Sequence, residues 1–156
     1  MVELIKHKHG IGQSAYHLVW RPKYNFSCFR NPYPRKVVMD ALKQTAERWN
    51  VKIYEMEVMP NHIHIFVEVP PTMTVSFCLQ ILKGGSSREF FKKCTIWRRF
   101  FLGHGQKKCH LWSPGKFFRS VGSVTAEVVE SYIKNSNSWD FEYLKKQQTQ
   151  ITAFAN

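Results

Sequence analysis

Two histidines stand one residue apart in the segment Met59-Pro-Asn-His-Ile-His-Ile-Phe-Val-Glu-Val69. Side chains alternate between the two faces of a β-strand, so His62 and His64 should share one face while Ile63 and its apolar neighbours occupy the other. Two neutral imidazoles on one face can hold one divalent metal ion. Most HxH pairs on strands are structural, so a metal site needs support from a second group.

Tyr132 is that second group, because the pattern around it predicts a helix that can pack against the strands. A tyrosine hydroxyl is a poor nucleophile at neutral pH, since its reference pKa is about 10. A divalent ion held by the histidines could polarise a scissile phosphate and neutralise charge on its oxygens. Attack by Tyr132 on DNA would then give a covalent phosphotyrosine. Alternatively, Tyr132 is an ordinary aromatic residue that packs a helix on a sheet.

Hydrophobic periodicity predicts the elements that must position these residues. Strands are expected at 15–20, 51–58, 62–69 and about 115–121, and helices at 35–49, about 74–94 and about 125–137. Met59-Pro60-Asn61 is a tight connection that makes a hairpin of the second and third strands. A loop is expected after residue 94, and Gly84-Gly85 should weaken the middle of the second helix.

The predicted order is β-α-β-β-α-β with an added C-terminal helix, which is an α+β, ferredoxin-like arrangement with an antiparallel sheet. The first two helices should cover the Ile63 face of the sheet, so His62 and His64 look out from the opposite face, where the added helix can carry Tyr132. The length of 156 residues fits a single domain, with a core of about 13–137 and a C-terminal extension at 138–156.

The charge favours a polyanionic partner, because 23 Lys and Arg against 11 Asp and Glu give a net charge of +12. Between Arg88 and Arg119, nine basic residues and one acid alternate with aromatic residues. Basic side chains contact phosphates and exposed rings stack on unpaired bases, so this stretch favours single-stranded nucleic acid. The alternative is that the rings are core and the charges form a solvated surface.

The four cysteines, Cys28, Cys78, Cys94 and Cys109, form no CxxC pair and predict reduced thiols in a cytosolic protein. A zinc site from Cys94, His104, Cys109 and His110 is conceivable, although its spacing fits no standard zinc module. The N-terminus has no apolar signal region, and no stretch approaches the length of a transmembrane helix. We expect a cytoplasmic protein with no membrane partner.

Four ordered motifs resemble the single-tyrosine HUH transposases of small insertion sequences and their relatives associated with repetitive extragenic palindromes. They are His17-Leu-Val-Trp-Arg-Pro-Lys-Tyr24, Met59-Pro-Asn-His-Ile-His-Ile65, Leu82-Lys-Gly-Gly-Ser-Ser-Arg88, and Ser120-Val-Gly followed by Tyr132-Ile-Lys-Asn. The resemblance covers roughly residues 13 to 137 in the right order. Four ordered motifs are far more specific than any one of them.

The resemblance implies a dimeric enzyme that binds hairpins in single-stranded DNA at the ends of a mobile element. Such enzymes cleave one strand with Mg²⁺ or Mn²⁺, form a 5′-phosphotyrosine and a free 3′-OH, and rejoin strands. The family's metal histidines correspond to His62 and His64, and its nucleophile corresponds to Tyr132. The tyrosine helices can be exchanged between two subunits of the dimer.

Two positions depart from the family pattern. Asn61 replaces a frequent Asp before the first metal histidine, which is compatible with turn chemistry. Ser136 stands where the family usually has a glutamine ligand, four residues after the tyrosine. We therefore expect the metal to be completed by Ser136, by the neighbouring amide of Asn135 or by water.

We expect phosphate contacts from nine basic residues: Arg21, Lys23, Lys83, Arg88, Arg98, Arg99, Lys107, Lys108 and Arg119. Two other functions compete with a transposase. One is a non-catalytic, single-stranded nucleic-acid-binding module, since RNA-recognition domains share the topology and stack bases on aromatic residues of the sheet, for which Phe66 is available. The other is a metal-dependent hydrolase that uses bound water and no covalent tyrosine.

Overall fold

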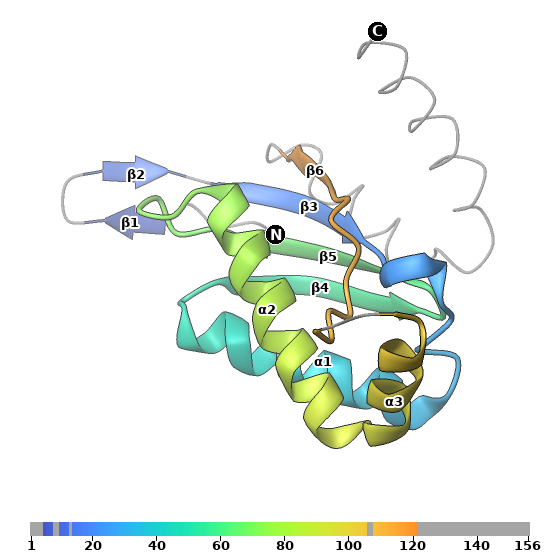
Figure 1. The fold of residues 1–156 in the computed structure, drawn as a ribbon. Coiled ribbons are helices and arrows are strands. Elements are labelled where there is room, and N and C mark those ends of the chain that lie inside the picture. The colour runs from blue at the N-terminus through green and yellow to red at the C-terminus, as the bar shows by residue number, and fades with distance from the viewer. Residues whose placement is uncertain (1–4, 8–9, 13, 106–107, 122–156) are drawn as a thin grey trace, which may run out of the picture.

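The computed structural model describes residues 5–7, 10–12, 14–105 and 108–121. Its main body is a four-stranded sheet with helices packed on one face (Figure 1). The elements are β1 (Ile5–His7), β2 (Gly10–Gly12), β3 (Ala15–Trp20), η1 (Lys23–Asn25), α1 (Pro32–Arg48), β4 (Lys52–Met59), β5 (His62–Glu68), α2 (Val75–Lys93), α3 (Thr95–Gly103) and β6 (Phe117–Ser120). The predicted α+β, antiparallel fold class is confirmed.

The sheet has the strand order β4-β5-β3-β6, and every neighbouring pair is antiparallel. This is the strand order of a ferredoxin-like domain. The strand β5 is central, and its His64 lies opposite Val19 of β3 and Glu57 of β4. The predicted helix at about 125–137 lies outside the described residues. A separate hairpin of β1 and β2 was not predicted, because three-residue strands carry too little periodicity to be recognised.

The helix α1 begins at Pro32, three residues before the predicted start. Its prolines lie in the first turn, where a backbone N–H has no partner within the helix, so proline costs nothing there. The helix is followed by Asn50 at φ 54°, a left-handed conformation that asparagine tolerates well. Pro32 and Pro34 therefore belong to the helix.

The helix α3 occupies residues predicted to be loop. Its first residue has no side-chain cap, and its aromatic and arginine residues give no clear start signal. Phe101 is fully buried while Ile96 is 82% exposed, so α3 packs on the domain by one side only. Among the helices in the described ranges, none combines the length and apolarity that a membrane span requires.

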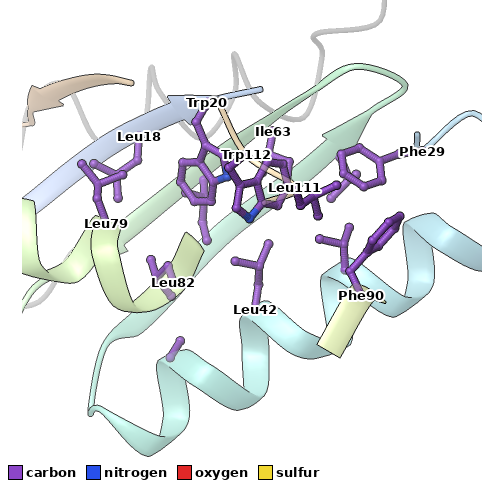
Figure 2. Close-up of a cluster of buried hydrophobic side chains, with 14 of the residues drawn as sticks. Leu18, Trp20, Phe29, Leu42, Ile63, Leu79, Leu82, Phe90, Leu111 and Trp112 are labelled. Atoms are coloured by element: carbon purple, nitrogen blue, oxygen red, sulfur yellow. The ribbon is translucent and has the colours of Figure 1, made fainter. Parts of the chain in front are cut away.

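The core fills the space between the sheet and the helices. Figure 2 shows Leu18, Trp20 and Ile63 of the sheet facing Leu42 of α1 and Leu79 and Leu82 of α2. On β5, the buried core includes Ile63, Ile65 and Val67, as the alternation predicted. The same face is closed by Leu111 and Trp112, which come from the segment leading to β6.

The segment Leu82–Arg88 anchors this closing stretch to α2. The buried Ser86 hydroxyl accepts a hydrogen bond from Trp112 Nε1 at 3.0 Å, and Ser87 Oγ accepts one from the Leu111 backbone N–H at 3.1 Å. Lys83 Nζ donates to the Ser113 carbonyl at 2.7 Å. Several polar residues of this motif therefore have a structural role.

Gly85 allows α1 and α2 to approach closely, and its replacement should destabilise the protein. A Cβ atom at Gly85 would stand 2.9 Å from Thr45 Cγ2 and closer still to Thr45 Oγ1. Thr45 cannot swing away freely, because its hydroxyl donates to the Ala41 carbonyl at 2.8 Å. We expect Gly85→Ala to lower the free energy of unfolding by about 1–3 kcal/mol, measured by urea denaturation.

Gly84 is the matched control, since it lies in the same helix and a Cβ there would meet nothing within 4 Å. Gly84→Ala should stabilise the helix by up to about 1 kcal/mol, because alanine has the higher helix propensity. If the two substitutions changed the free energy of unfolding equally, close packing against Thr45 would not be the reason for a glycine at position 85.

Candidate metal site and nucleic-acid interface

The two histidines of β5 lie on the sheet face opposite the helices, as predicted. They alternate with Ile63 and Ile65, which belong to the core under α1 and α2. His62 is 8% exposed and His64 is 1% exposed, and all seven residues of β5 are buried. The histidines are therefore shielded from solvent, on the sheet face where the sequence pattern placed them.

The ring of His62 is oriented by the residue before it. His62 Nδ1 lies 2.8 Å from Asn61 Oδ1, and the amide of Asn61 is itself held by a 3.3 Å hydrogen bond from its Nδ2 to Asn25 Oδ1. A carbonyl oxygen only accepts, so His62 Nδ1 is the donor, and in the neutral ring the lone pair lies on Nε2. The sequence indicated only that Asn61 suits a turn, whereas the structure shows that its side chain accepts a hydrogen bond from His62.

The ring of His64 contacts a third histidine on the neighbouring strand. His64 Nδ1 lies 3.1 Å from His17 Nε2, and the two rings stack with centroids 5.3 Å apart and planes 16° apart. Burial, followed by the nearby charges of His62 and His17, lowers the pKa of His64 to about 3. The His64 ring is therefore neutral at physiological pH, which is the form that binds a metal.

The donor set fits a divalent metal. Both Nε2 atoms are buried, and the two rings lie with centroids 5.0 Å apart at 74°. Within 5–7, 10–12, 14–105 and 108–121, no three His, Cys, Asp or Glu side chains are grouped to hold a metal ion. The predicted nucleophile Tyr132 and the predicted ligands Asn135 and Ser136 lie outside the described residues.

The alternative zinc site is not formed. Cys94, His104, Cys109 and His110 are all described, and they do not form a metal-binding group. Cys94 is buried, and His104 Nδ1 bonds to the Phe100 carbonyl at 2.8 Å. All four cysteines are free thiols, as predicted.

A basic groove of about 810 Å³ lies in the helical layer, away from the histidines. It is lined by α2, by α3 and by residues 109–114, and its cationic side chains are Lys23, Lys83, Arg88, Lys92 and Arg98. Burial, and then the nearby charge of Lys116, lowers the pKa of Lys83 to about 8, so this amine stays mostly charged at neutral pH. The groove brings together four of the nine predicted phosphate contacts and adds Lys92.

The other predicted phosphate contacts lie elsewhere. Arg119 of β6 pairs with His17, so its side chain shares the histidine face of the sheet. Arg21, Arg99 and Lys108 do not line the groove, although Arg99 and Lys108 are exposed. Lys107 lies outside the described residues.

Many of the aromatic residues predicted to stack on bases belong to the core. Phe90, Phe91, Phe101 and Trp112 are all less than 9% exposed. Phe118 and Phe100, at 48% and 40%, keep exposed ring surface. The alternative interpretation of the basic stretch, aromatic core under a charged surface, is right for half of its rings.

Phe66 bears on the RNA-recognition alternative. It lies on the histidine face between His64 and Glu68 and is fully buried, with its ring against Tyr54. A stacking platform needs rings that a base can reach. Phe66 therefore offers no platform, and the sequence-based expectation that it was available is wrong.

Comparison with known proteins identifies the family. A family model described as IS200-like transposase matches residues 11–136. The chain belongs to this transposase family. It is 33% identical over 120 residues to the transposase of insertion sequence IS200 from Salmonella typhimurium, covering 77% of this chain and 74% of that protein. It is 25% identical over 136 residues to the ISDra2 transposase TnpA of Deinococcus radiodurans, covering 87% and 93%.

Solved structures share the fold of this transposase. A Deinococcus radiodurans protein assigned as a transposase superposes with a TM-score of 0.65 at 23% identity, covering 85% of this chain and 97% of that chain. A tyrosine transposase associated with REP sequences, bound to a REP hairpin, superposes with a TM-score of 0.53 at 13% identity, covering 83% and 70%. The predicted resemblance to these transposases is confirmed.

Proposed function

We propose that this transposase cleaves and rejoins single-stranded DNA through a covalent tyrosine intermediate. The observation that carries the proposal is the pair of buried imidazoles on β5, each with its Nδ1 within hydrogen-bond distance of a neighbouring side chain and its Nε2 buried. Two such ligands on one rigid strand are suited to a metal that acts on a phosphate.

Tyr132 is the proposed nucleophile. Its Oη would form a bond to the scissile phosphorus while the bond from phosphorus to O3′ breaks. The phenolic proton is lost to solvent, and the departing O3′ takes up a proton to become a free 3′-OH. The product is a 5′-phosphotyrosine, which conserves the phosphodiester energy for rejoining by the reverse reaction.

His62 and His64 would hold Mg²⁺ or Mn²⁺, with Asn135, Ser136 or water completing the ligand set. When bound, the ion would polarise the scissile phosphate and neutralise charge on its oxygens. Asn61 and His17 lie within hydrogen-bond distance of the Nδ1 atoms of the two rings and restrict their orientation. Burial keeps the His64 ring neutral, which is the form that binds a metal.

The proposed substrate is single-stranded DNA with hairpins at the element's ends. The REP-associated neighbour is bound to a REP hairpin, and the basic groove of this chain offers several cations for a phosphate backbone. Arg119 could contact the strand on the histidine face, next to His17.

We further propose that the protein is a homodimer whose two subunits can exchange their tyrosine helices. Light scattering measures the molar mass in solution and would distinguish a dimer from a monomer.

The groove should determine the salt dependence of DNA binding. Arg88 and Arg98 are exposed and line it, so removing either should lose about one phosphate contact. We expect Arg88→Ala and Arg98→Ala each to reduce the slope of log affinity against log salt by about one unit. Fluorescence anisotropy with a labelled hairpin oligonucleotide at several salt concentrations measures this slope.

Arg48→Ala provides the control, since Arg48 is exposed at the end of α1 and does not line the groove. It removes the same charge and should leave the slope unchanged. If the groove variants behaved like Arg48→Ala, the groove would be only a charged surface and the DNA would bind elsewhere.

The reaction itself is tested with a hairpin oligonucleotide labelled at each end in turn and supplied with Mn²⁺. We expect a fragment with a free 3′-OH and a second fragment attached to protein after denaturation. Release of both fragments with free ends would identify a hydrolase. Binding without cleavage, for every hairpin drawn from the DNA flanking the gene, would favour a non-catalytic module.

A further inference from the structure

We propose that His17 is a positioning residue that fixes the metal-binding tautomer of His64. This inference rests on the proposed function, because it assigns a role toward the metal that His62 and His64 would hold. His17 belongs to β3, so the proposal adds a second strand to the site. It also explains why a polar ring lies in an otherwise apolar strand, Ala15-Tyr-His-Leu-Val-Trp20.

The geometry restricts how the two rings can share a proton. His17 Nε2 and His64 Nδ1 are 3.1 Å apart, so one of them donates and the other accepts. If His64 Nδ1 donates, its Nε2 keeps a lone pair for the metal. If His17 Nε2 donates, His64 must carry its proton on Nε2 and cannot bind without losing it. The metal therefore requires His17 to be the acceptor.

The ring of His17 is held in place for this role. It stacks on His64 at an interplanar angle of 16°, and the ring of Phe117 of β6 meets its edge with centroids 6.2 Å apart. Both neighbouring strands thus contact His17. A ring fixed in this way can set both the tautomer and the rotation of His64.

Asn61 performs the same function for His62. Its carbonyl oxygen accepts from His62 Nδ1 at 2.8 Å, which would leave Nε2 of that ring as the atom that binds the metal. Metal-binding histidines commonly donate their second N–H to such a partner, and loss of the partner typically weakens metal binding about 10–100-fold. The site consequently has two ligands and two orienting residues.

The test compares Mn²⁺ binding and the histidine tautomers of the full-length protein and three variants. His17→Phe keeps a ring but removes the acceptor, so we expect Mn²⁺ affinity to fall about 10–100-fold in isothermal titration. His17→Gln restores an accepting oxygen and should recover most of the affinity. His104→Phe makes the same chemical change outside the site and should bind like the wild type.

Nitrogen-15 NMR of the metal-free protein measures which ring nitrogen of His64 carries the proton. A purely structural role of His17 would leave this tautomer unchanged in the variants. We expect His64 to carry its proton on Nδ1 in the wild type and in His17→Gln, and to populate both tautomers in His17→Phe. Wild-type His64 protonated on Nε2, or unchanged Mn²⁺ affinity in His17→Phe, would overturn the role of His17. Failure of the wild type to bind Mn²⁺ would instead overturn the proposed metal site, and this role with it.

Discussion

Tyr132→Phe should abolish the covalent protein–DNA adduct and strand cleavage while leaving hairpin binding within about twofold of the wild type. The substitution removes only the oxygen that attacks phosphorus, and the other proposed nucleophile, a bound water, would give no adduct. Denaturing electrophoresis of a labelled oligonucleotide measures the adduct, and anisotropy measures binding. We expect no other removal of a single atom to reduce strand cleavage as much.

Tyr33→Phe is the matched control for the loss of a phenolic oxygen. Tyr33 is 61% exposed in the first turn of α1 and lies outside the histidine site, so its variant should form the adduct at the wild-type rate. An adduct formed by Tyr132→Phe would assign the nucleophile to another residue. Loss of DNA binding in that variant would show instead that Tyr132 contributes to the interface.

His62→Ala and His64→Ala should each suppress cleavage by a hundredfold or more and weaken Mn²⁺ binding. One remaining imidazole is a poor site for a hard divalent ion. Loss of the ion removes several kcal/mol of charge stabilisation in the transition state, and every ~1.4 kcal/mol corresponds to about tenfold in rate. Cleavage rates across a Mn²⁺ titration, with affinity from calorimetry, measure both effects.

Both histidines are buried, so each alanine variant also needs a measurement of its unfolding free energy. His104→Ala removes an imidazole from the end of α3, and we expect its cleavage rate and Mn²⁺ affinity to match the wild type. A folded His64→Ala that cleaved at the wild-type rate in limiting Mn²⁺ would mean that the histidine pair is structural.

The sequence predicted the strands well because their signal is local. Alternation from Ile63 to Val67 placed the apolar residues under the helices and the histidines on the other face, as the structure shows. The starts of α1 and α3 were harder to predict. Prolines are tolerated in a first helical turn, and α3 packs by one side only, with Ile96 left exposed.

The parts of the site that sequence reasoning missed depend on pairing between distant strands. His17 meets His64 only because β3 pairs with β5, and the single residue gives no periodic signal. Its presence in the first of the four family motifs was the available sign. Asn61 was named, but only the structure shows that its amide is held by Asn25 and accepts from His62.

The basic groove illustrates the same limit. Lys23, Lys83, Arg88 and Arg98 were all predicted as phosphate contacts. Only the structure shows that η1, α2, α3 and the stretch 109–114 bring them together in one groove, with Lys92 added. Half of the aromatic residues between Arg88 and Arg119 are buried in the core. Composition alone cannot tell which aromatic residues are buried and which are exposed.

The most direct test of the central claim is to identify the residue that carries DNA after reaction with a hairpin oligonucleotide. Wild-type protein would be incubated with Mn²⁺, denatured, digested with protease and nuclease, and the modified peptide sequenced by mass spectrometry. We predict a 5′-linked phosphate on Tyr132, formed with Mn²⁺ or Mg²⁺ and absent when the metal is chelated. Modification of a different residue, or cleavage that leaves every peptide unmodified, would contradict the account.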